Sequence, residues 1–215
     1  RQRQMCIRDR AYAGYLVDKE VATLSSVKDD PQHPYVVVLG GSKVSDKLGV
    51  IEALAEKADK IIIGGGMCYT FLAAQGHNVQ KSLLQDDMVD TCKELIERFG
   101  DKLLLPVDVA AGAEFDKDTE KKIVGLDEIP EGWMGLDIGP DTAKNYAEAV
   151  KDSKTVFWNG PMGVFEFPNF ADGTKAVAEA MIAATKDNDS FTVVGGGDSA
   201  ASVLSLIHIS EPTRQ

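Results

Sequence analysis

The sequence has little cysteine, little histidine and no long run of apolar residues. Its three cysteines, Cys6, Cys68 and Cys92, are far apart and never form a CxxC pair, which argues against a disulfide framework or a structural zinc site. The three histidines lack HExxH-like spacing, so a metalloprotease-type zinc site is not expected. No apolar run approaches the ~18 residues that cross a bilayer. We therefore expect a cytoplasmic protein without a membrane partner.

Positive charge is also scarce. The 215 residues include 23 Lys and Arg against 34 Asp and Glu, a net charge of −11. Nucleic-acid binding normally requires a basic face, so we expect no nucleic-acid partner. A hydrophobic content of 44% is that of a globular chain and excludes disorder, collagen and coiled coil. An acidic chain can still bind phosphate where its cations are local.

Short apolar runs alternate with longer amphipathic stretches. Continuous apolar runs of four to seven residues are typical of strands buried on both faces of a parallel sheet. The predicted strands are Tyr35–Leu39, Lys60–Ile63, Leu103–Val109, Thr155–Trp158 and Phe191–Val194. The predicted helices between them are Val44–Ala58, Met67–Gln75, Gln85–Phe99, Asp141–Ala149 and Gly173–Thr185. This alternation predicts an α/β fold, a Rossmann-like three-layer arrangement in which helices cover both faces of a parallel sheet.

The remaining segments set the expected domain boundaries. A helix at Tyr12–Leu24 and a polar linker fill residues 11–34, and an incomplete nucleotide-binding α/β domain fills 35–204. The charged stretch Ala111–Glu131 predicts surface turns or a small inserted hairpin. Residues 1–10 and 205–215 do not continue the strand–helix pattern. Our hypothesis is that both are foreign or disordered.

Four predicted strands run directly into a glycine-rich turn. The segments are VVVLGGSKVSDK, IIIGGGM, VFWNGPMGVFE and TVVGGGDSAAS. Glycine after a parallel strand admits a ligand close to the backbone and leaves the next helix's first N–H groups available to an anion. One such turn is more often simple turn chemistry. Four at the carboxyl edge of one sheet, where α/β proteins bind ligands, favour a phosphate site.

The sequences of these turns narrow the class of ligand that they could bind. Neither GxxxxGK[ST] nor GxGxxG occurs. Lys43 lies in the first loop and Lys47 is expected one turn into the following helix, where cations make sense beneath a polyphosphate. The alternative is a pair of solvated lysines. In the last turn, Asp198 either binds Mg²⁺ on the phosphates or, like Ser199, caps a helix.

The segment WNGPMGVFE suggests an adenosine site. Its apolar residues would face the base, and Glu166 would accept from the ribose hydroxyls. The alternative is a tight turn with a core phenylalanine and a solvated glutamate.

Together these motifs resemble those of the phosphoglycerate kinase family. GGSKVSDK, IIIGGGMCYTF, LPVDV, GWMGLDIGP, WNGPMGVFE and GGGDSAA occur in that family's order, and the resemblance runs from about Ala13 to Val203. It implies two α/β domains joined by a hinge helix. One domain binds 3-phosphoglycerate on a basic patch, and the other binds Mg-ADP or Mg-ATP. The chain resembles the interdomain helix and most of the nucleotide domain.

The resemblance also implies roles for individual residues. Lys43 and Lys47 would contact the phosphates, and Lys43 would contact the phosphoryl group during its transfer. Asp198 would hold Mg²⁺. Gly197 and Ser199 would open the helix that receives the transferred group. The adenine pocket would be lined by Gly65, Gly66, Gly135 and Leu136, and the remaining contacts to the nucleotide would come from Gly41, Ser42, Asn159, Pro161, Gly163, Val164, Glu166 and Gly196.

The implied reaction is reversible phosphoryl transfer between 1,3-bisphosphoglycerate and ADP, giving 3-phosphoglycerate and ATP in glycolysis. The bisphosphoglycerate half-site and its catalytic arginine would belong to a domain that the chain lacks. We therefore expect weak nucleotide binding and no turnover from the chain alone, and a monomeric full-length enzyme. The sheet would also expose an apolar face where the family's last elements are absent.

Two other functions are weighed against this one. If the chain is taken as a whole protein in itself, it would be a non-catalytic module that binds adenine nucleotide. A nicotinamide dehydrogenase would need GxGxxG and an acidic residue about twenty positions later, which no loop provides.

Overall fold

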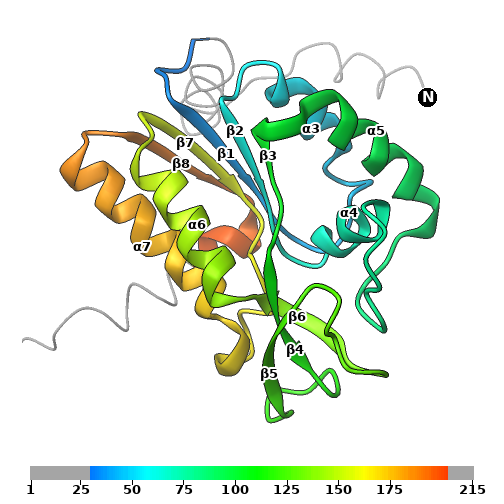
Figure 1. Ribbon diagram of the computed structural model, residues 1–215. Helices are drawn as coiled ribbons and strands as arrows, with labels where there is room; N and C mark the ends of the chain where they lie inside the picture. The colour runs from blue at the N-terminus through cyan, green and yellow to red at the C-terminus, as the bar shows by residue number, and fades with distance from the viewer. Residues whose placement is uncertain (1–29, 203–215) are drawn as a thin grey trace, which may run out of the picture. The chain divides into compact units, whose positions relative to one another are not determined.

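A five-stranded parallel sheet forms the centre of the fold (Figure 1). Its strand order is β3-β2-β1-β7-β8, and every neighbouring pair is parallel. The strands are β1 (Tyr35–Leu39), β2 (Lys60–Ile63), β3 (Leu103–Leu104), β7 (Thr155–Asn159) and β8 (Phe191–Gly195). In the centre, Val38 of β1 is paired with Ile62 on one side and Trp158 on the other. All of β1 is buried, as its unbroken apolar run predicts.

This computed structural model describes residues 30–202, and all of them from Gln32 onward belong to one structural unit. The predicted helix Tyr12–Leu24 and the segments 1–10 and 205–215 lie outside the described residues. Within the described range, no helix combines the length and the apolarity that crossing a bilayer requires.

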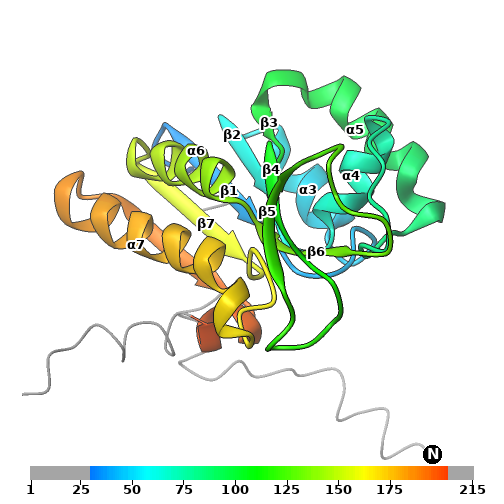
Figure 2. The same ribbon diagram turned by 60° about the horizontal axis from the view of Figure 1, so that its bottom comes forward.

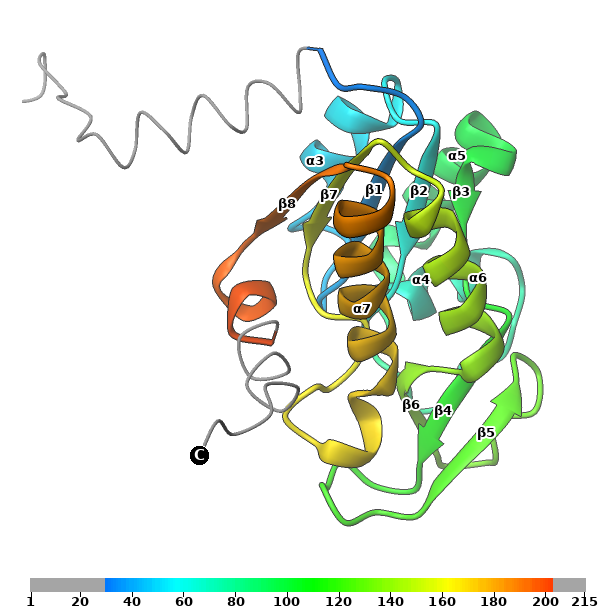
Figure 3. The same cartoon turned by 90° about the vertical axis from the view of Figure 1, so that its left-hand side faces the viewer.

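Helices cover both faces of the parallel sheet, which confirms the predicted fold class. Figure 3 looks onto α6 and α7, with the sheet behind them and the other helices beyond it. The helices are α3 (Leu48–Ala55), α4 (Cys68–Ala74), α5 (Val89–Phe99), α6 (Pro140–Lys151) and α7 (Asp172–Asp187), with short 3-10 turns η1 (Asp86–Met88), η2 (Gly100–Lys102) and η3 (Pro168–Phe170). Val36, Val38, Trp158, Tyr146 and Val177 belong to the buried core between the sheet, α6 and α7.

A second, antiparallel sheet has the strand order β5-β4-β6 (Figure 2). Its strands are β4 (Asp108–Gly112), β5 (Lys121–Gly125) and β6 (Met134–Ile138). The prediction of one strand over Leu103–Val109 is wrong, because the chain leaves the parallel sheet around Pro106, which has no N–H to donate to a ladder. Of the two interpretations of Ala111–Glu131, the inserted hairpin is correct, and β6 adds a third strand.

Helix α3 begins later than the sequence predicts. Residues 44–47 form a turn, in which Lys47 N–H donates to the Val44 carbonyl at 2.9 Å. Val44 N–H donates outward, to Gln85 Oε1 at 2.6 Å. Lys47 is therefore the N-cap of α3 rather than a residue one turn inside it. The predicted helix start at Val44 is wrong because the Val44 carbonyl accepts from Lys47 in this turn, and the helical pattern begins only with Ile51 N–H donating to the Lys47 carbonyl at 2.8 Å.

Strand β8 ends the parallel sheet on the side away from β3. Among the described residues it pairs only with β7, and Phe191 on it is 48% exposed. Val194 on the same strand is 36% exposed, so β8 presents two apolar side chains at the surface of the described residues.

Two buried tyrosines differ in what their hydroxyls contact. Tyr146 donates to the Ile63 carbonyl at 2.7 Å, linking α6 to β2. Tyr35 is fully buried, and its hydroxyl has no hydrogen-bond partner within residues 30–202. Burial raises the pKa of both side chains, since the phenolate would lose its hydration.

We predict opposite effects from removing the two hydroxyls. Tyr35→Phe removes an unsatisfied buried group and raises the free energy of unfolding by about 1 kcal/mol. Tyr146→Phe leaves the Ile63 carbonyl unpaired and lowers it by about 1–2 kcal/mol. Urea denaturation of both variants measures the difference, and equal effects would contradict the assignment.

Candidate functional site

The four predicted glycine-rich turns meet at one edge of the parallel sheet. The loop after β7, Gly160–Val164, contacts the other three. Gly41 N–H donates to the Pro161 carbonyl at 3.0 Å, and Gly65 N–H donates to the Met162 carbonyl at 2.9 Å. Gly160 N–H in turn donates to Ser199 Oγ at 2.6 Å. Two of these bonds join backbone to backbone and the third ends on a serine hydroxyl, so the loops are held together at the edge where a parallel sheet places its strand ends.

Glycine is required where these loops touch. A Cβ on Gly40 would lie 2.1 Å from the Pro161 carbonyl oxygen. Gly160 has a φ of +102°, and a Cβ there would lie 2.3 Å from the Gly40 backbone. Both a side chain's volume and its backbone preference oppose substitution at Gly160.

The larger of two cavities at this edge has a volume of about 500 Å³. The predicted site residues that line it are Gly41, Ser42, Gly65, Gly66, Gly135, Leu136, Pro161, Gly163, Val164, Glu166 and Asp198. Its lining is mostly apolar, with Glu166 exposed. Such a cavity suits a flat, largely apolar group.

Other residues of this cavity were not predicted. They are Tyr69, Lys81, Leu83, Phe115, Met134, Asp137, Met162 and Phe165. Phe115 comes from the β4–β5 loop and stays 64% exposed, with its ring centroid 5.0 Å from that of Phe167. A phenylalanine within the charged segment Ala111–Glu131 is the sequence feature that could have indicated Phe115 as a residue of the cavity.

The smaller cavity, of about 190 Å³, contains the remaining predicted site residues. It is lined by Lys43, Lys47, Asn159, Gly196, Gly197 and Ser199, and also by Asp46 and Gly160. Gly41, Ser42, Pro161 and Asp198 line both cavities. The structure therefore brings the whole predicted set together around two adjoining spaces, one apolar and one with lysines and exposed backbone.

The two lysines of the smaller cavity have different surroundings. Lys43 is exposed. Lys47 is half-buried and donates from Nζ to Asn159 Oδ1. Burial lowers the pKa of Lys47, while Asp46 and Asp198 act in the opposite direction. Its ammonium thus lies among hydrogen-bond acceptors next to a space that an anion could occupy.

The segment after β8 does not use its polar side chains as helix caps. Residues 197–202 are helical, so Asp198 and Ser199 lie inside the first turn rather than at its N-cap. Ser199 is buried and accepts the Gly160 N–H described above. Asp198 is exposed at the wall between the cavities. The helix-cap interpretation of Asp198 is therefore wrong, and its binding of Mg²⁺ stays a prediction.

Trp158 belongs to the core rather than to either cavity. It is fully buried, and its Nε1–H donates to the Gly160 carbonyl at 2.7 Å. The indole therefore holds the loop after β7 in place through this hydrogen bond from the core.

A magnesium ion that arrives with a polyphosphate fits the donor set. Within residues 30–202, no group of three or more His, Cys, Asp or Glu side chains could hold a metal ion. Mg²⁺ commonly uses one or two carboxylates together with substrate phosphates, and the exposed carboxylate of Asp198 lines both cavities. Cys68 and Cys92 are buried free thiols, and burial raises the pKa of Cys92 to about 12.

Comparison with known proteins identifies the family. The model of the family described as phosphoglycerate kinase matches residues 4–211. The chain belongs to the phosphoglycerate kinase family.

Relatives in that family cover nearly all of the chain. The phosphoglycerate kinases of Corynebacterium glutamicum (strain R) and Corynebacterium aurimucosum are 67% and 69% identical to it, over 91% of the chain and 48% of their own length. The solved structure of the phosphoglycerate kinase from Coxiella burnetii superposes with a TM-score of 0.85 at 38% identity, over 91% of this chain and 50% of that one. The enzyme from Pyrococcus horikoshii OT3 gives 0.74 at 30% identity, over 89% and 49%.

The chain thus spans about half the length of the phosphoglycerate kinases that it matches. Membership in this family removes the nicotinamide dehydrogenase from consideration.

The tight packing of the loops yields a prediction at Gly40. Gly40→Ala forces the loop after β7 away and lowers the free energy of unfolding by about 2 kcal/mol or more. A Cβ on Gly49, inside α3, would meet nothing within 4 Å. Gly49→Ala is therefore the matched control and should raise stability by up to about 1 kcal/mol. Thermal unfolding of both variants tests this, and a neutral Gly40→Ala would be inconsistent with the close approach.

Proposed function

We propose that the chain supplies the Mg-nucleotide half-site of a phosphoglycerate kinase. The observation that carries the proposal is the pair of adjoining cavities with Gly41, Ser42, Pro161 and Asp198 in both linings. A nucleotide has an apolar base and a polyanionic tail, and these two spaces match its two parts. The family membership supports the same conclusion.

The smaller cavity would hold the phosphates. Lys43 and Lys47 provide positive charge, and backbone N–H groups of Gly196, Gly197 and Ser199 would add donors. Asp198 would bind the Mg²⁺, which neutralises phosphate charge when it is bound. Phosphoryl transfer requires little covalent chemistry from the protein, so positioned cations and N–H groups are sufficient equipment.

The larger cavity would hold the adenosine. Gly65, Gly66, Gly135 and Leu136 leave a thin apolar slot for the base, and Val164 covers part of it. A Cβ on Gly135 would lie 1.9 Å from the Tyr69 hydroxyl oxygen, so this wall cannot carry a side chain. The exposed carboxylate of Glu166 would accept from the ribose hydroxyls.

In the whole enzyme the reaction would be reversible phosphoryl transfer between 1,3-bisphosphoglycerate and ADP, giving 3-phosphoglycerate and ATP in glycolysis. The phosphoglycerate compounds would be bound by the half of the protein that this chain does not span. Lys43 would meet the phosphoryl group during transfer. We propose a cytoplasmic, monomeric full-length enzyme.

Nucleotide binding tests the half-site directly. The chain should bind MgADP weakly in calorimetry and should not bind NAD. Lys47→Met should weaken MgADP about 10-fold or more, because a charge-assisted phosphate contact is lost. Lys144→Met, at an exposed lysine of α6, is the control and should leave the affinity unchanged. NAD binding, or equal affinity in both variants, would contradict the proposal.

Catalysis tests the missing half. A coupled assay with ATP and 3-phosphoglycerate should detect no turnover from the chain alone. Aligning both reactants is worth about 7–11 kcal/mol, and only one reactant has a site here. Turnover near the ~1–100 s⁻¹ of a typical kinase would refute the assignment of this chain as a half-site.

A further inference from the structure

We propose that Asp137 is a positioning residue for the nucleotide, holding the Gly163 wall of the larger cavity against the start of α7. The proposal rests on the proposed function for the ligand's identity. It concerns a buried residue that lines the larger cavity but not the smaller one, where Lys43 and Lys47 lie.

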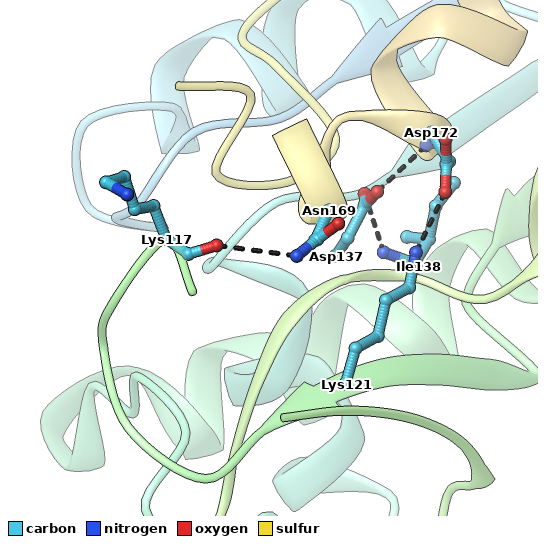
Figure 4. Close-up of polar contacts among 7 residues, drawn as sticks. Lys117, Lys121, Asp137, Ile138, Asn169 and Asp172 are labelled. Atoms are coloured by element: carbon cyan, nitrogen blue, oxygen red, sulfur yellow. Dashed lines mark hydrogen bonds and ion pairs between the residues drawn. The ribbon is translucent and has the colours of Figure 1, made fainter. Parts of the chain in front are cut away.

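The carboxyl group of Asp137 joins two elements from within the protein. It lies on β6 and is only 2% exposed. Its Oδ2 accepts from Gly173 N–H in the first turn of α7, and its Oδ1 accepts from Ile138 N–H, both at 2.9 Å (Figure 4). One carboxylate therefore ties the antiparallel sheet to the helix that follows the cavity loop.

The same carboxyl group supports the cavity loop by direct contact. A Cβ on Gly163 would lie 2.3 Å from Asp137 Oδ1, and a Cβ on Gly173 would lie 2.4 Å from the same atom. Asp137 is thus enclosed between two glycines, and no larger residue fits at either. Because Gly163 lines the larger cavity, a displacement of Asp137 would move that wall.

The loop residues beside Gly163 are held by the same two elements. Met162 N–H donates to Thr174 Oγ1 on α7 at 3.1 Å. Val164 N–H donates to the Leu136 carbonyl on β6 at 2.8 Å. The loop therefore bridges β6 and α7, and the Asp137–Gly173 bond fixes the spacing that it bridges.

Burying an ionisable group at this position costs desolvation free energy. Burial raises the pKa of Asp137 to about 7, although the two N–H donors and Lys121 favour the carboxylate. Asp172 opposes ionisation, yet it also pairs with Lys121 at 2.8 Å, which joins β5 to α7 (Figure 4). An apolar side chain would avoid the cost but could not accept from Gly173. The carboxyl group therefore contributes the hydrogen bond between β6 and α7, at the cost of being buried.

The test separates the two ends of the nucleotide. Asp137→Asn keeps the shape but replaces one acceptor oxygen by a donor, so the Gly173 and Ile138 N–H groups cannot both be satisfied. Calorimetry should show MgADP binding about 10-fold weaker, while Mg-pyrophosphate, which needs only the smaller cavity, stays within about twofold of the parent chain.

Asp108→Asn is the matched control. Asp108 is a buried carboxyl on β4 that accepts from Thr142 N–H at 2.8 Å and from Asp141 N–H at 3.1 Å, at the start of α6. It lines neither cavity. This variant loses comparable contacts at a different helix and should leave the ratio of the two affinities unchanged. Equal losses for both ligands in Asp137→Asn, or no loss for MgADP, would overturn the proposal.

Amide hydrogen exchange without nucleotide keeps the two proposals distinguishable. Exchange at Gly173 and Val164 should accelerate in Asp137→Asn and not in Asp108→Asn. A parent chain that binds no MgADP would refute the half-site, whereas unchanged exchange at these amides would refute the role of Asp137. If Asp137→Asn does not fold, Gly163→Ala displaces the same wall with the carboxyl intact, and it should show the same loss of MgADP with Mg-pyrophosphate unaffected.

Discussion

The backbone of the loop after β7 is the contact on which the rest of the site depends. Its Pro161 and Met162 carbonyls accept from the loops after β1 and β2, and Gly160 N–H reaches the segment after β8. Parallel pairing brings the strand ends together, but it does not by itself make the loops touch. They touch because Gly40 and Gly160 have no side chain at the point of closest approach. The two cavities lie around these hydrogen-bonded loops.

Local pattern was sufficient for the elements that pack in the usual way. The continuous apolar runs of β1, β2, β7 and β8 and the amphipathic stretches between them predicted the three-layer fold, because burial on both faces leaves a direct mark on composition. The glycine turns could be placed at one edge because the carboxyl ends of parallel strands lie at the same edge of a sheet. All the predicted site residues line the two cavities, although their roles toward a ligand stay proposals.

The predictions of local structure are wrong where a residue distant in the sequence determines the conformation. The run Leu103–Val109 reads as one strand, but its two halves enter different sheets on either side of Pro106. Val44 reads as helical, but its carbonyl accepts from Lys47 in a turn, and Gln85 holds its N–H from 41 residues away. Phe115 and Leu83 reach the larger cavity from connecting segments that carry no periodic signal. None of these contacts is encoded within a short window of sequence, so no reading of spacing could have supplied them.

The exposure of Lys43 and Asp198 has a consequence for side reactions. On the proposed function, a nucleotide would have its base in the larger cavity and its terminal phosphate beside the exposed Lys43 and Asp198, open to water. Water is then the competing nucleophile, and a transferase must exclude it at the moment of reaction. Nothing on this rim of the described residues does so. On the proposed function, excluding water from the smaller cavity would therefore be a task separate from binding the nucleotide.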